Sequence, residues 1–166
     1  GVLKLIKDIL MKDQQFDISD LVVALFDSVG NITKKNVDML QFILNINYEQ
    51  HKFTMKRNFT DMFTNLIHHR DYNVPMALAI FVLQYISRTG LTGIDDEIFG
   101  ASLGFLYNNK PPFDAVLPIL QILLIATSST DHAAFMVKNG FADYISQLPL
   151  LYPKDSRVVS IIPLFC

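Results

Sequence analysis

The feature that most constrains the fold is a short apolar segment with a glutamine at its centre, which occurs three times. The three copies are Leu40-Gln41-Phe42, Leu83-Gln84-Tyr85 and Leu120-Gln121-Ile122. Gln41 and Gln84 are 43 positions apart, and Gln84 and Gln121 are 37 apart. A period of about 40 residues is typical of proteins built from stacked helical repeats. The chain is therefore expected to stack similar helical units along one direction.

Two longer segments extend the repeat beyond the glutamine. Residues 40–66 align with residues 120–148 when one residue is inserted before the short helix and Gly140 after Asn139. The aligned pairs are His51 with His132, Met55 with Met136, Asn58 with Asn139, and Asp61 with Asp143. Residues 71–81 also align with residues 155–165, which would place a fourth glutamine two positions beyond Cys166. This register, and a first residue that is not methionine, predict a fragment of a longer protein.

Apolar residues at helical spacing predict an all-α chain, and no segment alternates strictly enough for a strand. Gly30, the pair Gly90 and Gly93, and the run that ends at Pro112 mark breaks between helices. The predicted helices cover residues 2–11, 21–29, 34–46, 49–57, 59–69, 73–88, 95–107, 114–127, 131–139, 141–150 and 156 onward. Asp20, Asp61 and Asp143 each begin a similar helix, where a carboxylate stabilises the free N–H groups.

Residues 132–148, with the turn Asn139-Gly140 between two helical stretches, resemble the first two helices of an armadillo repeat. Residues 34–88 are a fair match that lacks the glycine. Residues 2–32 and 91–109 match poorly, and the related HEAT repeat remains the alternative for residues 1–33 and 91–112. The resemblance implies a right-handed α-solenoid of about three to four armadillo-like repeats, as a single domain over residues 1–166.

In armadillo proteins the third helices line a concave groove that binds extended peptides or partner helices. The groove positions that carry tryptophan and asparagine in peptide-binding members align here with Gln41 and Asn45, Gln84 and Arg88, and Gln121 and Ile125. The chain has no tryptophan, so the ladder that grips nuclear-import signals is absent. The resemblance implies partner binding through Gln41, Asn45, Gln84, Arg88 and Gln121.

The recurring glutamines have two interpretations. An amide both donates and accepts hydrogen bonds, which suits the backbone of an extended ligand. The same amide could instead bond a neighbouring helix and hold the repeats in register.

Composition excludes several classes of partner. With 51% hydrophobic and 18% charged residues the chain is not disordered. A net charge of -2 gives no general attraction to nucleic acid or to an anionic membrane. The single Cys166 cannot form an internal disulfide, and no apolar run is long enough to span a membrane. We expect an intracellular protein, in the cytoplasm with the nucleus as the alternative.

No motif predicts catalysis, a metal or another cofactor. His68, His69 and Asp71 are too close in sequence to converge as helical metal ligands, which sit four residues apart. The segment between Gly90 and Gly93 is too short to cradle a phosphate. We therefore expect a non-catalytic scaffold for another protein. The alternative is a self-association module that uses exposed apolar residues such as Phe105, Phe113 and Phe165.

Overall fold

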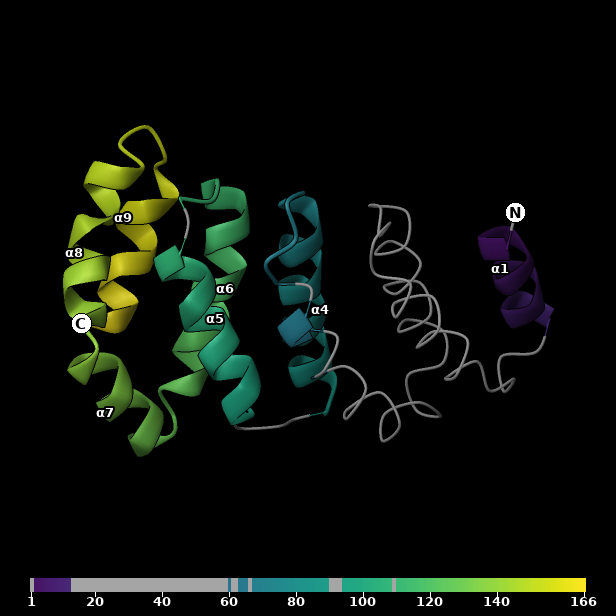
Figure 1. Cartoon of the computed structure of the whole chain (residues 1–166), viewed down its shortest axis with the longest axis horizontal. Helices are drawn as coiled ribbons and strands as arrows, with labels where there is room; N and C mark the ends of the chain where they lie inside the picture. The colour runs from purple at the N-terminus through teal and green to yellow at the C-terminus, as the bar shows by residue number, and fades with distance from the viewer. Residues whose placement is uncertain (1, 13–59, 61–62, 66, 90–93, 109) are drawn as a thin grey trace. The chain divides into compact units, whose positions relative to one another are not determined.

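The computed structural model describes residues 2–12, 60, 63–65, 67–89, 94–108 and 110–166. These residues form helices joined by turns and contain no strand, which confirms the all-α prediction for this part of the chain (Figure 1). The helices are α1 (Val2–Lys12), α4 (Asn73–Thr89), α5 (Asp96–Asn108), α6 (Phe113–Ala126), α7 (Thr130–Lys138), α8 (Phe141–Leu151), α9 (Arg157–Ile161) and the 3-10 helix η2 (Ile162–Phe165).

Most predicted helix boundaries agree with the structure to within one or two residues. The helices predicted over 21–29, 34–46 and 49–57 lie outside the described residues. The helix predicted to reach His69 ends earlier, because residues 67–72 form turns and bends. The ring of His69 explains part of this difference, since its Nδ1 accepts a hydrogen bond from the backbone N–H of Asp71 at 3.1 Å.

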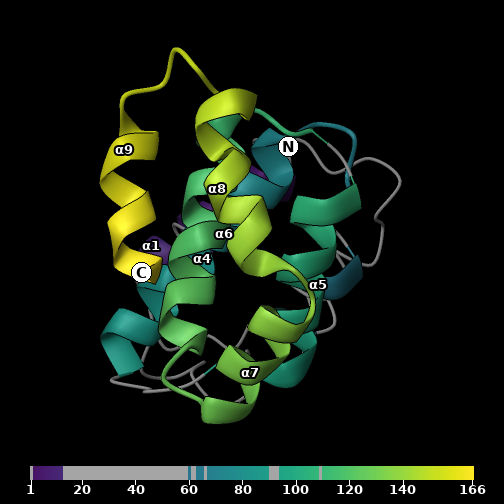
Figure 2. The same ribbon diagram turned by 90° about the vertical axis from the view of Figure 1, so that its left-hand side faces the viewer.

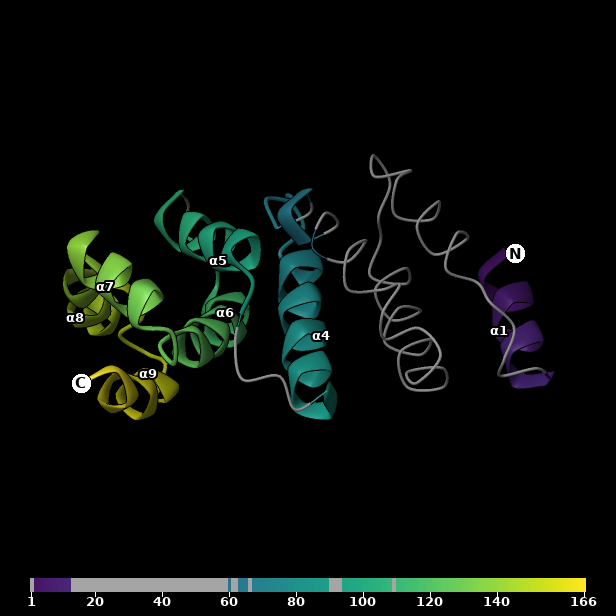
Figure 3. The ribbon, with the colours of Figure 1, turned by 90° about the horizontal axis from the view of Figure 1, so that it is seen from below.

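The chain divides into two compact units, Gly1–Phe81 and Val82–Cys166. In the second unit α5 packs on α6, α7 packs on α8, and α8 packs on both α9 and η2. Figure 3 shows α6 and α9 on one side of this unit and α5, α7 and α8 on the other. Its core is apolar and includes Phe105, Ile119 and Leu120, each at most 1% exposed.

Local sequence explains where these helices begin and end. Pro112 has an extended backbone and precedes the first residue of α6. Ser129 caps α7, because its side chain accepts a hydrogen bond from the N–H of His132 at 3.4 Å. Gly140 has φ +79°, a left-handed conformation that a residue with a Cβ rarely adopts, and it separates α7 from α8. The turn at Asn139-Gly140 therefore lies where the sequence predicts it.

The starts of α4 and α9 are built alike. The side chain of Asp71 accepts a hydrogen bond from the N–H of Asn73 at 3.0 Å, and that of Asp155 accepts one from Arg157 at 3.0 Å. The backbone oxygens of Asp71 and Asp155 also accept from Val74 and Val158. This agreement supports the alignment of residues 71–81 with 155–165.

Candidate partner-binding surface

The five residues predicted to bind a partner are described to different extents. Gln41 and Asn45 lie outside the described residues. Gln84 lies on α4 and Gln121 on α6, and both side chains are exposed. Arg88 lies in the last turn of α4, but the structure describes only its backbone. Neither Gln84 nor Gln121 has a hydrogen-bond partner among the described residues, so both amides can meet a ligand.

Most of α6 is enclosed, and only one narrow stripe reaches solvent. We call it the α6 stripe; its residues are Asp114, Leu117, Gln121, Leu124 and Ile125, of which Asp114 and Gln121 are exposed and the others half-buried. The remaining residues of the helix are buried. Leu117 is three residues after Asp114, Gln121 is four after Leu117, and Leu124 and Ile125 are three and four after Gln121, so the members share one face of the helix.

The same pattern occurs on α4. The α4 stripe consists of exposed Asn73, Gln84 and Ser87 and half-buried Met76, Ile80 and Leu83. When Gln84 is aligned with Gln121, Ile80 aligns with Leu117 and Ser87 with Leu124. Each stripe therefore places an aliphatic side chain one helical turn before an exposed amide.

The chemistry of these stripes suits a weakly charged ligand. An exposed amide offers both a donor and an acceptor to a peptide backbone, and the aliphatic groups beside it offer apolar contact. Asp114 is the only ionised group among the described side chains of the two stripes, and it is bonded to Arg157. The stripes therefore do not select for strongly charged peptides.

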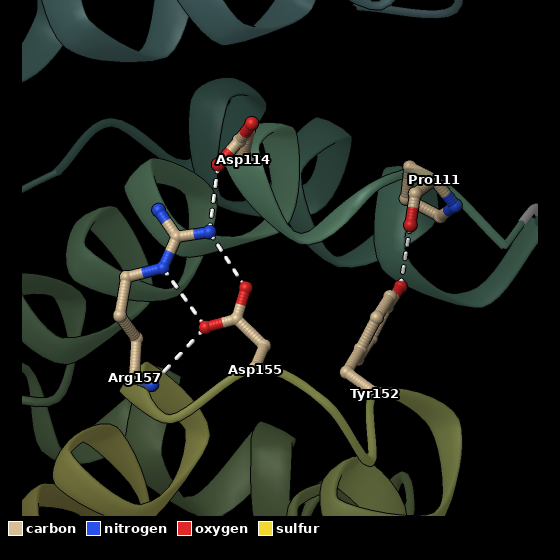
Figure 4. A network of polar contacts seen from close by, with 5 residues as sticks. All are labelled: Pro111, Asp114, Tyr152, Asp155 and Arg157. Carbon is tan, nitrogen blue, oxygen red and sulfur yellow. Dashed lines mark hydrogen bonds and ion pairs between the residues drawn. The ribbon is translucent and has the colours of Figure 1, made fainter.

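A polar network joins the start of α6 to the start of α9 (Figure 4). The guanidinium of Arg157 donates to Asp155 from Nε at 2.9 Å and from Nη2 at 2.7 Å. Nη2 also donates to Asp114 Oδ1 at 2.6 Å. The hydrogen bonds from Arg157 lower the pKa of Asp155, and those to Asp155 and Asp114 raise the pKa of Arg157. Asp155 and Arg157 therefore stay ionised at neutral pH.

Aromatic contacts reinforce this junction. The hydroxyl of Tyr152 donates to the carbonyl oxygen of Pro111 at 2.6 Å. The ring of Tyr152 lies 5.2 Å from that of Phe113, and the Arg157 guanidinium lies 5.2 Å from the Phe113 ring centroid. These side chains tie the α8–α9 loop to the start of α6. They were not predicted, although the alignment of Asp155 with Asp71 had already marked this segment as a helix start.

His132 and Asp96 form an imidazole–carboxylate pair, with Nε2 and Oδ1 2.7 Å apart. Such a pair occurs in general-base catalysis, where the second ring nitrogen reaches the substrate. Here His132 is only 8% exposed and stacks on Phe99 at 4.1 Å. Its Nδ1 is buried and has no hydrogen-bond partner in the described part of the chain. His132 therefore joins α7 to α5 through its contact with Asp96 and its stacking on Phe99.

Two tyrosines form a contact between α5 and α8. The rings of Tyr107 and Tyr144 meet edge to face at 5.7 Å. Burial raises the pKa of Tyr144, with smaller contributions from Tyr152 and Tyr107, and burial also raises the pKa of Tyr107. Both phenols stay protonated at neutral pH.

The residues predicted to mediate self-association do not provide an exposed surface. Phe105 and Phe113 are 1% and 4% exposed, so the prediction that they are exposed is wrong. Phe165 is half-buried, with its ring 5.2 Å from that of Phe141. The hydrophobic residues that are exposed in the second unit lie elsewhere: Tyr107, Phe135, Val137, Leu150, Val159 and Leu164.

The described residues contain neither a metal site nor a membrane-spanning helix. No group of histidine, cysteine and acidic side chains among them could hold a metal ion. None of the helices described is long and apolar enough to cross a membrane. Comparison of the chain with protein-family models, with curated proteins and with solved structures found no match.

Proposed function

We propose that this chain is a non-catalytic scaffold, an armadillo-like helical-repeat solenoid that binds a segment of another protein. The binding surface is the line of third helices that carries Gln41, Asn45, Gln84, Arg88 and Gln121. The observation that carries the proposal is the recurrence of one arrangement: Gln84 and Gln121 are both exposed, each one helical turn after a half-buried aliphatic residue. The single cysteine is in keeping with a location inside the cell.

The expected ligand is an extended peptide or an amphipathic helix. The exposed amides would bond its polar groups, and the aliphatic residues of the stripes would contact its apolar side chains. Because the described stripes carry one carboxylate that is already paired, a basic nuclear-import peptide is not the expected ligand.

The proposal is tested by identifying a bound protein and then measuring its affinity for designed variants. The test variant is Gln84→Ala combined with Gln121→Ala. Loss of two hydrogen-bonding groups is expected to weaken binding by about 10- to 100-fold, at roughly 1 kcal/mol each. The matched control is Gln147→Ala, since Gln147 is exposed on α8 and belongs to neither stripe. Equal affinities for the double variant, the control and the wild type would remove this surface from consideration.

A further inference from the structure

The turn between α7 and α8 contains the pair Asn139-Gly140, and the fold itself favours the glycine. Gly140 has φ +79°, which a residue with a Cβ rarely adopts, although a Cβ would find open space there. Asn139 precedes it as the C-cap of α7 and is exposed. Figure 2 shows the chain passing from α7 into α8 through this short turn. The fold therefore leaves an asparagine amide in water directly before a glycine.

This pair is chemically reactive, because glycine has no side chain to hinder attack by its backbone nitrogen. In the reaction the Gly140 nitrogen gives up its proton and bonds to Cγ of Asn139, the Cγ–Nδ2 bond breaks, and ammonia leaves with that proton. Water then opens the succinimide ring and gives aspartate or isoaspartate. Water is consumed and ammonia released, so no other reagent is needed. None of the chain's other asparagines is followed by glycine.

The folded turn keeps the two reacting atoms apart. Ring closure needs the Gly140 nitrogen to eclipse Cβ of Asn139 about the Cα–C bond, but Asn139 has ψ 22°, which turns that nitrogen away from Cβ. The leaving amide is also held, because Nδ2 of Asn139 donates to the carbonyl oxygen of Phe135 at 2.7 Å. The Gly140 N–H donates to the carbonyl oxygen of Val137 at 3.3 Å. Reaction therefore requires the last turn of α7 to open.

The product would lack the contact that caps α7. A carboxylate accepts hydrogen bonds but does not donate them, so it cannot replace the bond from Nδ2 to the Phe135 carbonyl. Its charge would also lie at the carbonyl end of α7, where the helix dipole disfavours an anion. The same turn is fastened to α5 by Tyr107, whose hydroxyl donates to the carbonyl oxygen of Asn139 at 3.5 Å. A change at Asn139 thus acts where α5, α7 and α8 meet.

We propose that Asn139 is a deamidation site gated by the last turn of α7: the folded turn slows the reaction, and the product weakens the turn. The conversion runs one way, because ammonia is lost to solvent. Asn139 lies on neither the α4 stripe nor the α6 stripe, so the proposal is independent of the partner-binding surface.

Peptide mapping by mass spectrometry measures deamidation at Asn139 in folded chain and in chain unfolded by guanidinium chloride, at the same pH and temperature. Unfolding should raise the rate at least about tenfold, because opening a helical turn breaks several hydrogen bonds. Asn73, which is followed by valine, is the internal reference and should react more slowly than Asn139 in the unfolded chain. Equal Asn139 rates in the two states, a faster rate in the folded chain, or an Asn73 rate that matches Asn139 in the unfolded chain would each overturn the proposal.

The effect of the product on the turn is measured with Asn139→Asp in thermal melts. We expect this variant to lower Tm by about 2–8 °C, because it loses the donor to Phe135 and places an anion at the end of α7. The matched control is Gln147→Glu, which makes the same change of amide to carboxylate at an exposed position of α8 and should leave Tm nearly unchanged. Equal Tm changes in the two variants would overturn the claim that the reaction weakens this turn.

Discussion

Helices α6 and α9 begin in similar surroundings and are tied together by Arg157, yet they end in opposite environments. In α6 everything except one stripe is buried, including Val116, Ile119 and Leu120. In α9 and η2 only Val158 and Ile161 are buried. α6 packs on α5, whereas α9 packs on α8 and leads into η2. The same substitution should therefore have very different effects in the two helices.

The largest expected difference comes from a charge placed at one repeat position in each helix. Val116 in α6 is fully buried, and its equivalent Pro163 is exposed. Val116→Lys would bury an unpaired ammonium at a cost of several kcal/mol, comparable with the whole stability of a small domain. We expect it to abolish cooperative urea unfolding of the second unit, while Pro163→Lys leaves the midpoint nearly unchanged. A similar loss in both variants would show that the face at Pro163 is already covered.

Truncating a leucine should also have unequal effects in α6 and η2. Leu120 in α6 is fully buried, and Leu164 in η2 is 55% exposed. Leu120→Ala should destabilise the protein by about 2–5 kcal/mol, because it removes buried methyl groups and leaves a cavity. Leu164→Ala should change the free energy of unfolding by no more than about 0.5 kcal/mol. Urea titrations followed by circular dichroism measure both values at a concentration where the chain is monomeric.

A smaller effect is expected at the junction between the two helices. Tyr152→Phe keeps the ring contact with Phe113 and removes the hydroxyl that donates to the Pro111 carbonyl. Loss of one such bond should cost about 0.5–1.5 kcal/mol. Tyr144→Phe is the matched control for removing a phenol hydroxyl from α8. Thermal melts measure the Tm of both variants. Equal Tm values for Tyr152→Phe and Tyr144→Phe would argue against a stabilising role for the Tyr152 hydrogen bond.

The smallest effect is expected for Arg157→Gln, because the ion pairs that it breaks are exposed to solvent. Its dependence on pH is nevertheless distinctive. Since Arg157 lowers the pKa of Asp155, the pair stabilises the folded state while the carboxylate is ionised. The difference in Tm between wild type and variant should be constant near neutral pH and shrink as the pH falls below about 4, the usual carboxyl range. A difference that persists at pH 2 would assign the effect to packing on Phe113.

Much of the described fold could be predicted because the residues that start and stop its helices act locally. Ser129, Gly140 and the two prolines before α6 act on the backbone within a few residues, so helix ends were placed nearly correctly. The exposure of Gln84 and Gln121 also follows from periodicity, since each is the single polar residue in the middle of an apolar segment of its helix. The prediction that Gln41, Asn45 and Arg88 share their surface stays a prediction.

The contacts that hold α6 and α9 together could not be predicted. Arg157 and Asp114 are 43 residues apart, and Tyr152 and Pro111 are 41 apart, so no local pattern marks them as partners. The wrong prediction for Phe105 and Phe113 has the same origin, because a large apolar residue looks alike in sequence whether or not another helix covers it.

The sequence by itself determined which residues form helices, where most of those helices end and which positions recur, because backbone conformation depends on near neighbours. Only the tertiary structure decided which recurring positions are covered, because burial depends on helices that are distant in the chain. Pro75 and Pro112 align when Gln84 is aligned with Gln121, yet the first is buried and the second is exposed. The short apolar segment around Gln121 thus lies within an enclosed helix that exposes its amide.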